Sequence, residues 1–249
     1  MNPLLSVVIP TYNEANRIEK TLLALKDFLD TQPLEWEIII SDDGSTDTTR
    51  TKIATITQNI PQARLIASEH GGKGRALKAG ISQSLGEYIF LFDADMSMPV
   101  RHLLRFLPPY LENFDIAIGS RNIPGSRKAL EPWSRSIQGR IFNKLVQLIA
   151  ISGISDTQCG FKCLRAAPLR PLVENLQIDG FAFDVELLMS AQQHGLSIIE
   201  VPIDWFYIPG SRVRPFVDPF TMLCDLIRLR YRRFNTRGTR DKPHSEQPH

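Results

Sequence analysis

Short apolar runs alternate with helix-like segments through the first half of the chain, and this alternation is the strongest constraint on the fold. The runs are rich in Val and Ile, and they read LLSVVIP, WEIIISDDGS, ARLIAS, EYIFLFDAD and DIAIGSR. Short strands separated by helical patterns are typical of parallel βαβ units with helices on both faces of one sheet. The sequence therefore predicts a single α/β domain over 1–235 with a mostly parallel central sheet.

The second half of the chain is less regular. A long basic loop, GSRNIPGSRKALEPW, precedes a predicted amphipathic helix over 134–151. LSIIEVPID predicts a strand, WFYIPGSRVRPF a loop, and the pattern that follows predicts a closing helix from about 218 to 234. Residues 236–249 are polar and lack an apolar face, which predicts a disordered tail.

Polar residues follow three of the predicted strands at their carboxyl ends. The segment 10–14 follows the first strand, Asp42 and Asp43 follow the second, and Asp93 and Asp95 end the fourth. Ligands of open α/β sheets bind in the crevice beyond these ends. We therefore expect the functional site at this edge of the sheet.

The pair Asp93 and Asp95 ends an apolar run, where a buried and unpaired charge is costly. No Lys or Arg follows until Arg101. Mg²⁺ and Mn²⁺ favour a few carboxylates together with phosphate oxygens and water, so a bound cation would compensate both charges. Two solvated surface acids are the alternative. A phosphatase of the haloacid dehalogenase type also uses D-x-D, but Met96 and Ser97 follow here and the strand is the fourth, which disfavours that class.

The segment HGGKGRALKAG, which contains Lys73, resembles a phosphate-binding turn. Its glycines permit close approach of the backbone, a helix N-terminus follows, and the lysine supplies a cation. It lacks the G-x-x-x-x-G-K-[ST] pattern of a P-loop, and no G-x-G-x-x-G follows the first strand. An ordinary dinucleotide enzyme is therefore disfavoured.

Composition narrows the class of partner. The net charge is only +2, although RLRYRRFNTRGTRDK concentrates positive charge near the C-terminus. A basic binding module without catalysis is an alternative, but few aromatic residues are interleaved and we expect no nucleic-acid partner. The three cysteines cannot pair completely, which favours reduced thiols in a cytoplasmic protein. No run reaches the ~18 apolar residues of a spanning helix, and the N-terminus has no pattern of a signal peptide.

Several motifs together resemble a known family. SVVIPTYNE, SDDGSTDTT, GKGRALKAG and FLFDAD occur in the order found in inverting family 2 glycosyltransferases of GT-A fold. SDTQCGFKCLR, GFAFDVELL and PIDWFYIPGSRVRPF resemble dolichyl-phosphate glucosyltransferases, with dolichyl-phosphate mannosyltransferases as close relatives. The resemblance implies inverting, metal-dependent transfer of a hexose from a nucleotide-diphosphate sugar to a polyprenyl phosphate. UDP-glucose is the expected donor, GDP-mannose the alternative, and Mg²⁺ or Mn²⁺ the expected cofactor.

The resemblance also implies roles for individual residues. The donor-binding positions are Pro10, Tyr12, Glu14, Asp42, Asp43, Lys73, Asp93 and Arg212. Asp93 and Asp95 are the expected metal ligands, and Ser97 stands where the mannosyltransferases commonly carry Gln. Asp95 is also counted as catalytic, with Asp184 as a base or positioning residue and Glu186 as its alternative.

An anionic acceptor needs cations, and a guanidinium grips phosphate through several donors. Arg121 and Arg135, in and after the basic loop, are the expected ligands of the lipid phosphate. Apolar faces flanked by basic residues suit peripheral contact with an anionic membrane surface, expected on its cytoplasmic face. They also suit a homodimer. The apolar positions are Ile137, Ile141, Leu145, Leu148, Ile149, Phe220, Leu223, Leu226, Ile227 and Phe234.

Overall fold

The chain forms a mixed α/β structure around one large sheet. A computed structural model describes residues 3–129, 133–208 and 217–240, with the side chains of all of these except 134–138 and 232–240. The strands of the large sheet are β1 (Leu5–Thr11), β2 (Trp36–Asp43), β3 (Ala63–Ser68), β4 (Tyr88–Leu91), β5 (Ile116–Ser120), β7 (Lys162–Arg165) and β8 (Ile198–Pro202). The helices are α1 (Ile18–Leu29), α2 (Thr49–Thr57), α3 (Lys73–Gln83), the 3₁₀ helix η1 (Val100–Phe106), α4 (Trp133–Ile149), α5 (Ala166–Glu174), α6 (Phe183–Gln193) and α7 (Val217–Arg240).

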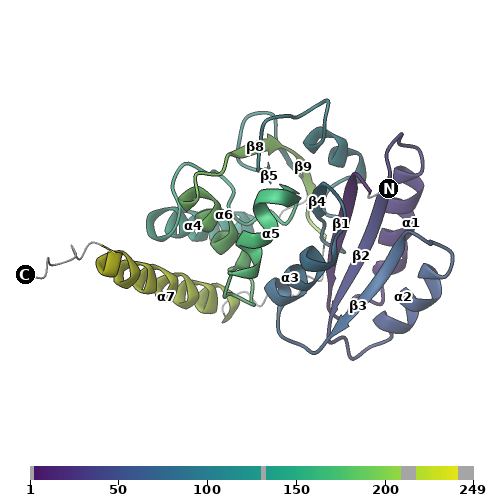
Figure 1. Ribbon diagram of the computed structural model, residues 1–249, viewed down its shortest axis with the longest axis horizontal. Coiled ribbons are helices and arrows are strands. Elements are labelled where there is room, and N and C mark those ends of the chain that lie inside the picture. Colours follow the sequence, from purple (N-terminus) through teal and green to yellow (C-terminus); the bar gives the residue numbers. More distant parts are fainter. Residues whose placement is uncertain (1–2, 130–132, 209–216, 241–249) are drawn as a thin grey trace, which may run out of the picture.

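The described strands are ordered β3-β2-β1-β4-β7-β5-β8 in the sheet. Neighbouring strands are parallel except where β7 pairs antiparallel with β4 and with β5. Helices lie on both sides, with α1 and α2 on one side and α3, α5 and α6 on the other (Figure 1). The mostly parallel α/β architecture predicted from the sequence is therefore confirmed.

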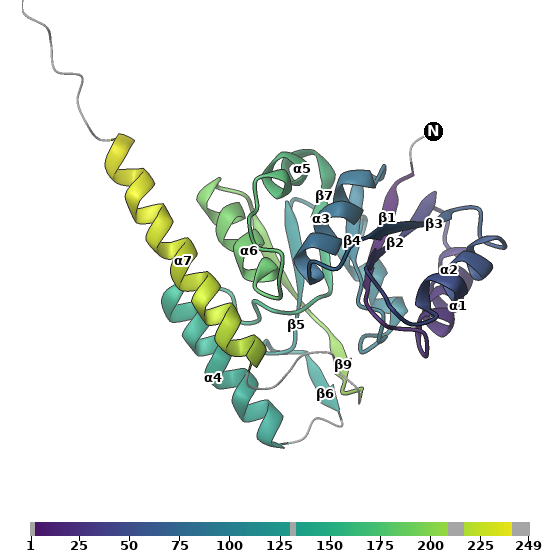
Figure 2. The ribbon, with the colours of Figure 1, turned by 90° about the horizontal axis from the view of Figure 1, so that it is seen from below.

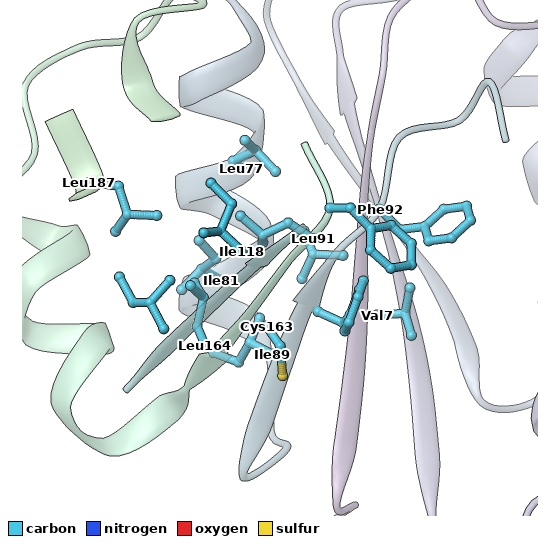
Figure 3. Packing of buried hydrophobic residues seen from close by; sticks show 14 of the residues in the cluster. Val7, Leu77, Ile81, Ile89, Leu91, Phe92, Ile118, Cys163, Leu164 and Leu187 are labelled. Atoms are coloured by element: carbon cyan, nitrogen blue, oxygen red, sulfur yellow. The ribbon is translucent and has the colours of Figure 1, made fainter. Parts of the chain in front are cut away.

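The central strands lie in the middle of the sheet because they are continuous apolar runs. Every residue of β2 and of β4 is buried, as expected for strands covered by helices on both faces. Figure 3 shows how side chains of α3 and α6 pack over β1, β4 and β7. The labelled residues include Val7, Leu77, Ile81, Ile89, Leu91, Cys163, Leu164 and Leu187.

Two features of the sheet differ from the sequence-based expectation. β7 was not predicted, and its register pairs Lys162 with Leu91 of β4 and with Ile118 of β5 at the centre of the sheet. The loops expected over 127–129 and from 205 onward instead contribute to a separate sheet of two short parallel strands, β6 (Arg127–Ala129) and β9 (Asp204–Phe206). Both corrections arise from contacts between segments far apart in the sequence.

The helices α4 and α7 lie side by side and extend from the body of the molecule (Figure 2). Arg230 of α7 donates to the carbonyl oxygens of Leu148 and Ile149 at 3.3 and 2.7 Å, at the C-terminus of α4. Both predicted helices exist, but α7 continues to Arg240, past the expected domain boundary at 235. The rest of the expected tail, 241–249, lies outside the described residues. No helix within the described ranges is long and apolar enough to cross a membrane.

Candidate active site

The carboxyl ends of β1 and β2 are tied together by backbone and side-chain hydrogen bonds. The N–H of Asn13 donates to Ser45 Oγ at 2.9 Å, and the N–H of Thr46 donates to Asn13 Oδ1 at 2.8 Å. Asn13 adopts a φ of 55°, a conformation that Asn tolerates better than most residues. The predicted meeting of the strand-end loops at one edge is therefore confirmed for β1 and β2.

Asp42 faces the protein interior and is fully buried. Its carboxylate accepts hydrogen bonds from the N–H of Ser45 at 3.0 Å and from Arg50 Nε at 2.5 Å. Thr11 donates to the same carboxylate at 3.3 Å, and the Ser45 hydroxyl donates as well. These partners join the ends of the two strands, and the direct contact of Asp42 with the donor that the resemblance implied stays a prediction.

Asp43 holds the glycine turn that precedes α3. The N–H groups of Gly71 and Gly72 donate to its carboxylate at 2.8 Å each, and His70 Nδ1 lies 2.8 Å from Asp43 Oδ2. The His70 ring stacks on Tyr12, with the ring centroids 4.3 Å apart. Asp43 itself is buried. The exposed part of this arrangement is the aromatic pair of Tyr12 and His70 at the edge of the sheet.

The other two residues of the first loop lie in or beside the β1 end. Pro10 pairs in register with Ser41 of β2 and is partly buried. The buried Glu14 accepts the backbone N–H of Arg17 and of Ile18 through its carbonyl oxygen, and its carboxylate lies 3.7 Å from Arg17 Nε. Pro10 therefore belongs to the end of β1, whereas Glu14 shapes the start of α1.

Lys73 opens α3 and forms an ion pair with Asp93 at the end of β4. Lys73 Nζ lies 2.9 Å from Asp93 Oδ1 and 3.9 Å from Asp184 Oδ2. Burial opposes the charge of Lys73, but Asp93 and Asp184 outweigh it and raise the pKa of the lysine. Burial likewise opposes the charge of Asp93, and Lys73 lowers the pKa of that carboxyl. No basic residue follows Asp93 closely in the sequence, but in the structure Lys73 is its ion-pair partner.

Gly160 closes the other side of the Asp93 carboxylate. A Cβ at Gly160 would lie only 2.0 Å from Asp93 Oδ2, so the chain requires glycine at this close approach. Gly72, with a φ of 113°, plays a similar part before α3, because a Cβ there would lie 2.5 Å from the carbonyl oxygen of Asp179. Gly160 thus permits close approach to Asp93, and Gly72 permits close approach of the turn before α3 to Asp179.

Asp95 is the carboxylate of this edge with no ion-pair partner in the described part of the chain. Its Oδ1 accepts the N–H of Ser97 at 2.9 Å. Burial, and then the negative charge of Asp93, raise the pKa of Asp95. A divalent cation would relieve this repulsion, and carboxylate oxygens suit Mg²⁺ and Mn²⁺.

The residues present therefore fit a divalent cation, with Asp95 as its main ligand. One oxygen of Asp93 is already engaged by Lys73, so Asp93 contributes less. No group of three or more His, Cys, Asp or Glu residues gathers as a metal site within the described ranges. Phosphate oxygens and water would complete the coordination, as Mg²⁺ usually requires.

Asp184 and Glu186 lie on α6, which is buried from Phe183 to Ala191, so both acids need partners inside the protein. Asp184 Oδ1 accepts a hydrogen bond from Lys162 Nζ at 2.6 Å. Glu186 accepts the backbone N–H of Gln177 at 3.1 Å and of Ile178 at 2.8 Å. Glu186 thus closes the loop before α6, and the catalytic role considered for it from the sequence stays a prediction.

Arg121 is held rigidly at the end of β5. Its Nε and Nη2 donate to Asp156 at 2.6 and 2.8 Å, and its guanidinium lies 5.5 Å from the centre of the Trp205 ring. Burial opposes the charge of Asp93, and Lys73, then Lys162 and last Arg121 lower the pKa of that carboxyl. Arg121 therefore acts electrostatically on the same edge as the acid pair.

Two predicted residues fall outside this description. Arg212 lies outside the described residues, and Arg135 lies on α4 with a side chain that is not described. Four residues of the site were missed from the sequence: His70, Asp156, Gly160 and Lys162. Lys162 carried a signal, because a lysine inside the apolar run GFKCLR needs a buried partner.

Comparison with known sequences agrees with this geometry. Residues 6–172 match the family described as Glycosyl transferase family 2. The Dolichyl-phosphate beta-glucosyltransferase of Dictyostelium discoideum is 34% identical over 93% of this chain and 75% of that protein. The protein of the same name from Saccharomyces cerevisiae is 34% identical over 91% of this chain and 74% of its own length.

Solved structures show the same fold. Mannosyl-3-phosphoglycerate synthase from Rubrobacter xylanophilus has a TM-score of 0.68 at 18% identity and covers 99% of this chain and 78% of its own. Glucosyl-3-phosphoglycerate synthase from Mycobacterium tuberculosis, in complex with Mn²⁺, UDP and glucosyl-3-phosphoglycerate, has a TM-score of 0.66 at 19% identity and covers 90% and 77%. The predicted GT-A fold is confirmed, and the chain belongs to glycosyl transferase family 2.

Proposed function

We propose that this chain transfers glucose from UDP-glucose to a polyprenyl phosphate of the dolichyl type, with inversion and with Mg²⁺ or Mn²⁺. The observation that carries the proposal is the charge arrangement at the strand ends. An acid pair suited to a cation lies beside Lys73, and a rigid Arg121 acts on the same edge. Relatives named Dolichyl-phosphate beta-glucosyltransferase, which match over nine-tenths of the chain, support glucose and this acceptor.

The donor would bind along the β1, β2 and β4 ends. Tyr12, backed by His70, offers an aromatic face for a nucleobase. Asp95, with Asp93, would hold the divalent cation, which would supply Lewis-acid charge for the diphosphate. Lys73, at the N-terminus of α3, adds a fixed positive charge to the same place. Arg212 remains a proposed donor contact.

The acceptor would bind on the Arg121 side. A phosphate monoester has a second pKa near ~6, so it is largely dianionic at neutral pH and is itself the nucleophile. One of its oxygens forms a bond to the anomeric carbon as the bond to UDP breaks, and the electron pair leaves with the diphosphate. No general base is needed. Arg121, aimed by Asp156 and Trp205, and Arg135 are the proposed phosphate ligands.

The α4 and α7 pair is the proposed membrane surface (Figure 2). Leu148 on α4 and Phe220 on α7 are 77% and 68% exposed, whereas Leu226 of α7 is buried. Further apolar and basic residues are exposed on the same two helices: Ile141, Leu145, Ile227, Tyr231, Arg140, Lys144, Arg228 and Arg230. Exposed apolar area with flanking cations suits the anionic cytoplasmic leaflet.

Activity assays with two donors test the proposal. UDP-glucose and GDP-mannose are each offered with a short polyprenyl phosphate and Mg²⁺ or Mn²⁺, with Asp95→Ala as the control variant. We expect transfer from UDP-glucose, reduced by ~10²-fold or more in the variant, as for loss of an electrostatic stabiliser. Transfer from GDP-mannose alone would contradict the assignment of glucose as the sugar. The absence of a lipid product with either donor would contradict the assignment of a polyprenyl phosphate as the acceptor.

Vesicle binding tests the membrane surface separately. Wild-type protein should sediment with vesicles that contain anionic lipid and less with neutral ones, and Leu148→Glu or Phe220→Glu should weaken sedimentation. If one of these variants lost dimerisation in sedimentation equilibrium but still bound vesicles, this face would be the contact with a second copy of the chain instead.

A further inference from the structure

Lys162 is a lysine at the centre of the sheet with no solvent-exposed surface. It lies on β7, between Leu91 of β4 and Ile118 of β5. An isolated ammonium in such a place is strongly unfavourable, so a buried lysine is kept only where partners compensate its charge. The function proposed above assigns Lys162 no part.

The partners of Lys162 lead to the site. Its Nζ donates to the carbonyl oxygen of Cys159 and to Asp184 Oδ1, the latter at 2.6 Å. The second oxygen of Asp184 lies 3.9 Å from Lys73 Nζ, and Lys73 Nζ lies 2.9 Å from Asp93 Oδ1. Four alternating charges, from β7, α6, α3 and β4, therefore run from the interior of the sheet to the acid pair.

This order of charges decides which carboxylate holds Lys73. Asp184 is buried and has two cations within reach, of which Lys162 is much the nearer. If Lys162 lost its charge, Asp184 would be a buried carboxylate whose nearest described cation is Lys73. Since attraction between charges is strong where water is excluded, Asp184 would then draw Lys73 away from Asp93.

We propose that Lys162 is a positioning residue that neutralises Asp184, so that the ammonium of Lys73 stays at Asp93 and faces the donor diphosphate. The inference rests on the proposed donor. It assigns Asp184 to the support of Lys73 and gives it no proton to transfer. Lys162 itself touches neither substrate, because it has no exposed surface.

A ratio of nucleotide affinities tests this role. UDP and UMP share a base and a ribose, and UDP carries the second phosphate that Lys73 would contact. Lys162→Met should lower the UDP-over-UMP affinity ratio by about tenfold, the size of one charge-assisted contact. Lys73→Met should lower it equally, and Lys162→Met should change it no further in that background. General loosening of the fold would weaken both nucleotides and leave the ratio unchanged.

Two variants serve as controls. Lys78, also on α3, pairs with Asp179 at 2.6 Å outside the charge chain, so Lys78→Met should leave the ratio unchanged. The double variant Lys162→Met with Asp184→Asn removes both charges, so Lys73 should remain at Asp93 and the ratio should return to that of the wild type. The double variant carries the test if the single variant does not fold.

The outcomes separate this inference from the proposed function. A wild-type chain that prefers UDP to UMP, together with a folded Lys162→Met that keeps the full preference, would overturn the inference alone. A double variant with a ratio as low as that of Lys73→Met would also overturn it. A wild-type chain with no preference for UDP would overturn the proposed donor and the inference with it.

Discussion

Replacing Gly160 with alanine should displace the Asp93 carboxylate and slow sugar transfer. The added Cβ would lie 2.0 Å from Asp93 Oδ2, whereas a carbon and an oxygen in ordinary contact are ~3.3 Å apart. The carboxylate would thus have to move by roughly 1.3 Å. Its other oxygen is 2.9 Å from Lys73 Nζ, so this movement disturbs the ion pair. A misplacement of ~1 Å in a catalytic arrangement costs on the order of 10²-fold in rate, or about 2.7 kcal/mol.

Initial rates of glucose transfer to a short polyprenyl phosphate measure this effect, with thermal unfolding of each variant as a check on folding. Gly139→Ala is the matched control, because outside its own stretch of helix no atom of the described residues lies within 4 Å of the Cβ that it adds. We expect kcat to fall by about 10²-fold for Gly160→Ala and to stay unchanged for Gly139→Ala. Overpacking should lower the free energy of unfolding of Gly160→Ala by ~1–3 kcal/mol.

A folded Gly160→Ala protein with the wild-type kcat would refute the reasoning. It would mean that the Asp93 carboxylate has room to move without effect on the reaction. A lower kcat with the same loss in the Gly139→Ala control would refute it as well, because the loss would not depend on the close approach to Asp93.

Three further predictions concern Arg121, Asp156 and the cysteines. Arg121→Lys should raise the KM for the polyprenyl phosphate by about tenfold or more, because lysine lacks the planar fork that Asp156 holds. Steady-state kinetics with each substrate varied would contradict this if the donor KM alone changed. Burial opposes the charge of Asp156, but Arg121 outweighs it and lowers the pKa of Asp156. The pair therefore stabilises the fold above the unfolded pKa of about 4, and this stabilisation is lost as the pH falls through the lowered folded-state pKa. Urea unfolding from about pH 7 downwards should show Asp156→Asn less stable than wild type, with a difference that shrinks in acid; a constant difference would contradict the assignment. Burial raises the pKa of Cys159 to about 12, so at about pH 8 a maleimide should modify the partly exposed Cys224 and spare Cys159. Mass spectrometry of the native protein reads this out, and modified Cys159 would count against its burial.

The sheet was predictable where each strand carries its own signal. β1, β2 and β4 are apolar runs that end in turn residues, and each would be assigned in isolation. β7 interrupts its apolar run with Lys162, which its partners Asp184 and the carbonyl oxygen of Cys159 make tolerable. β6 and β9 have three residues each, so their pairing depends on contacts between distant segments and not on a local pattern.

The candidate site shows the same division. The position of an acid at a strand end follows from the sequence, and the edge that gathers Asp93 and Asp95 was predicted. The partner that each acid takes does not follow, because it depends on which side chains the fold brings near. The partners of Asp42 and Asp43 inside the protein, the loop at Ser45 and the glycine turn at 71–72, could not be read from the sequence, and their contact with the donor stays a prediction. Lys73 was expected near the donor, but its ion pair with Asp93 was not anticipated.

The antiparallel insertion of β7 sets an order for folding. β7 pairs with β4 across a long stretch of chain that includes the whole of α4, and such non-local pairing is slow to form. During synthesis the N-terminal part of a chain emerges first, so β1 to β4 are available well before β7. Lys162 lies on β7 and Gly160 just before it, so both arrive with this late strand. A partly made chain can therefore already pair Asp93 with Lys73. Gly160 and Lys162, and Asp184 on α6 after them, join the charged edge only once α4 has been made.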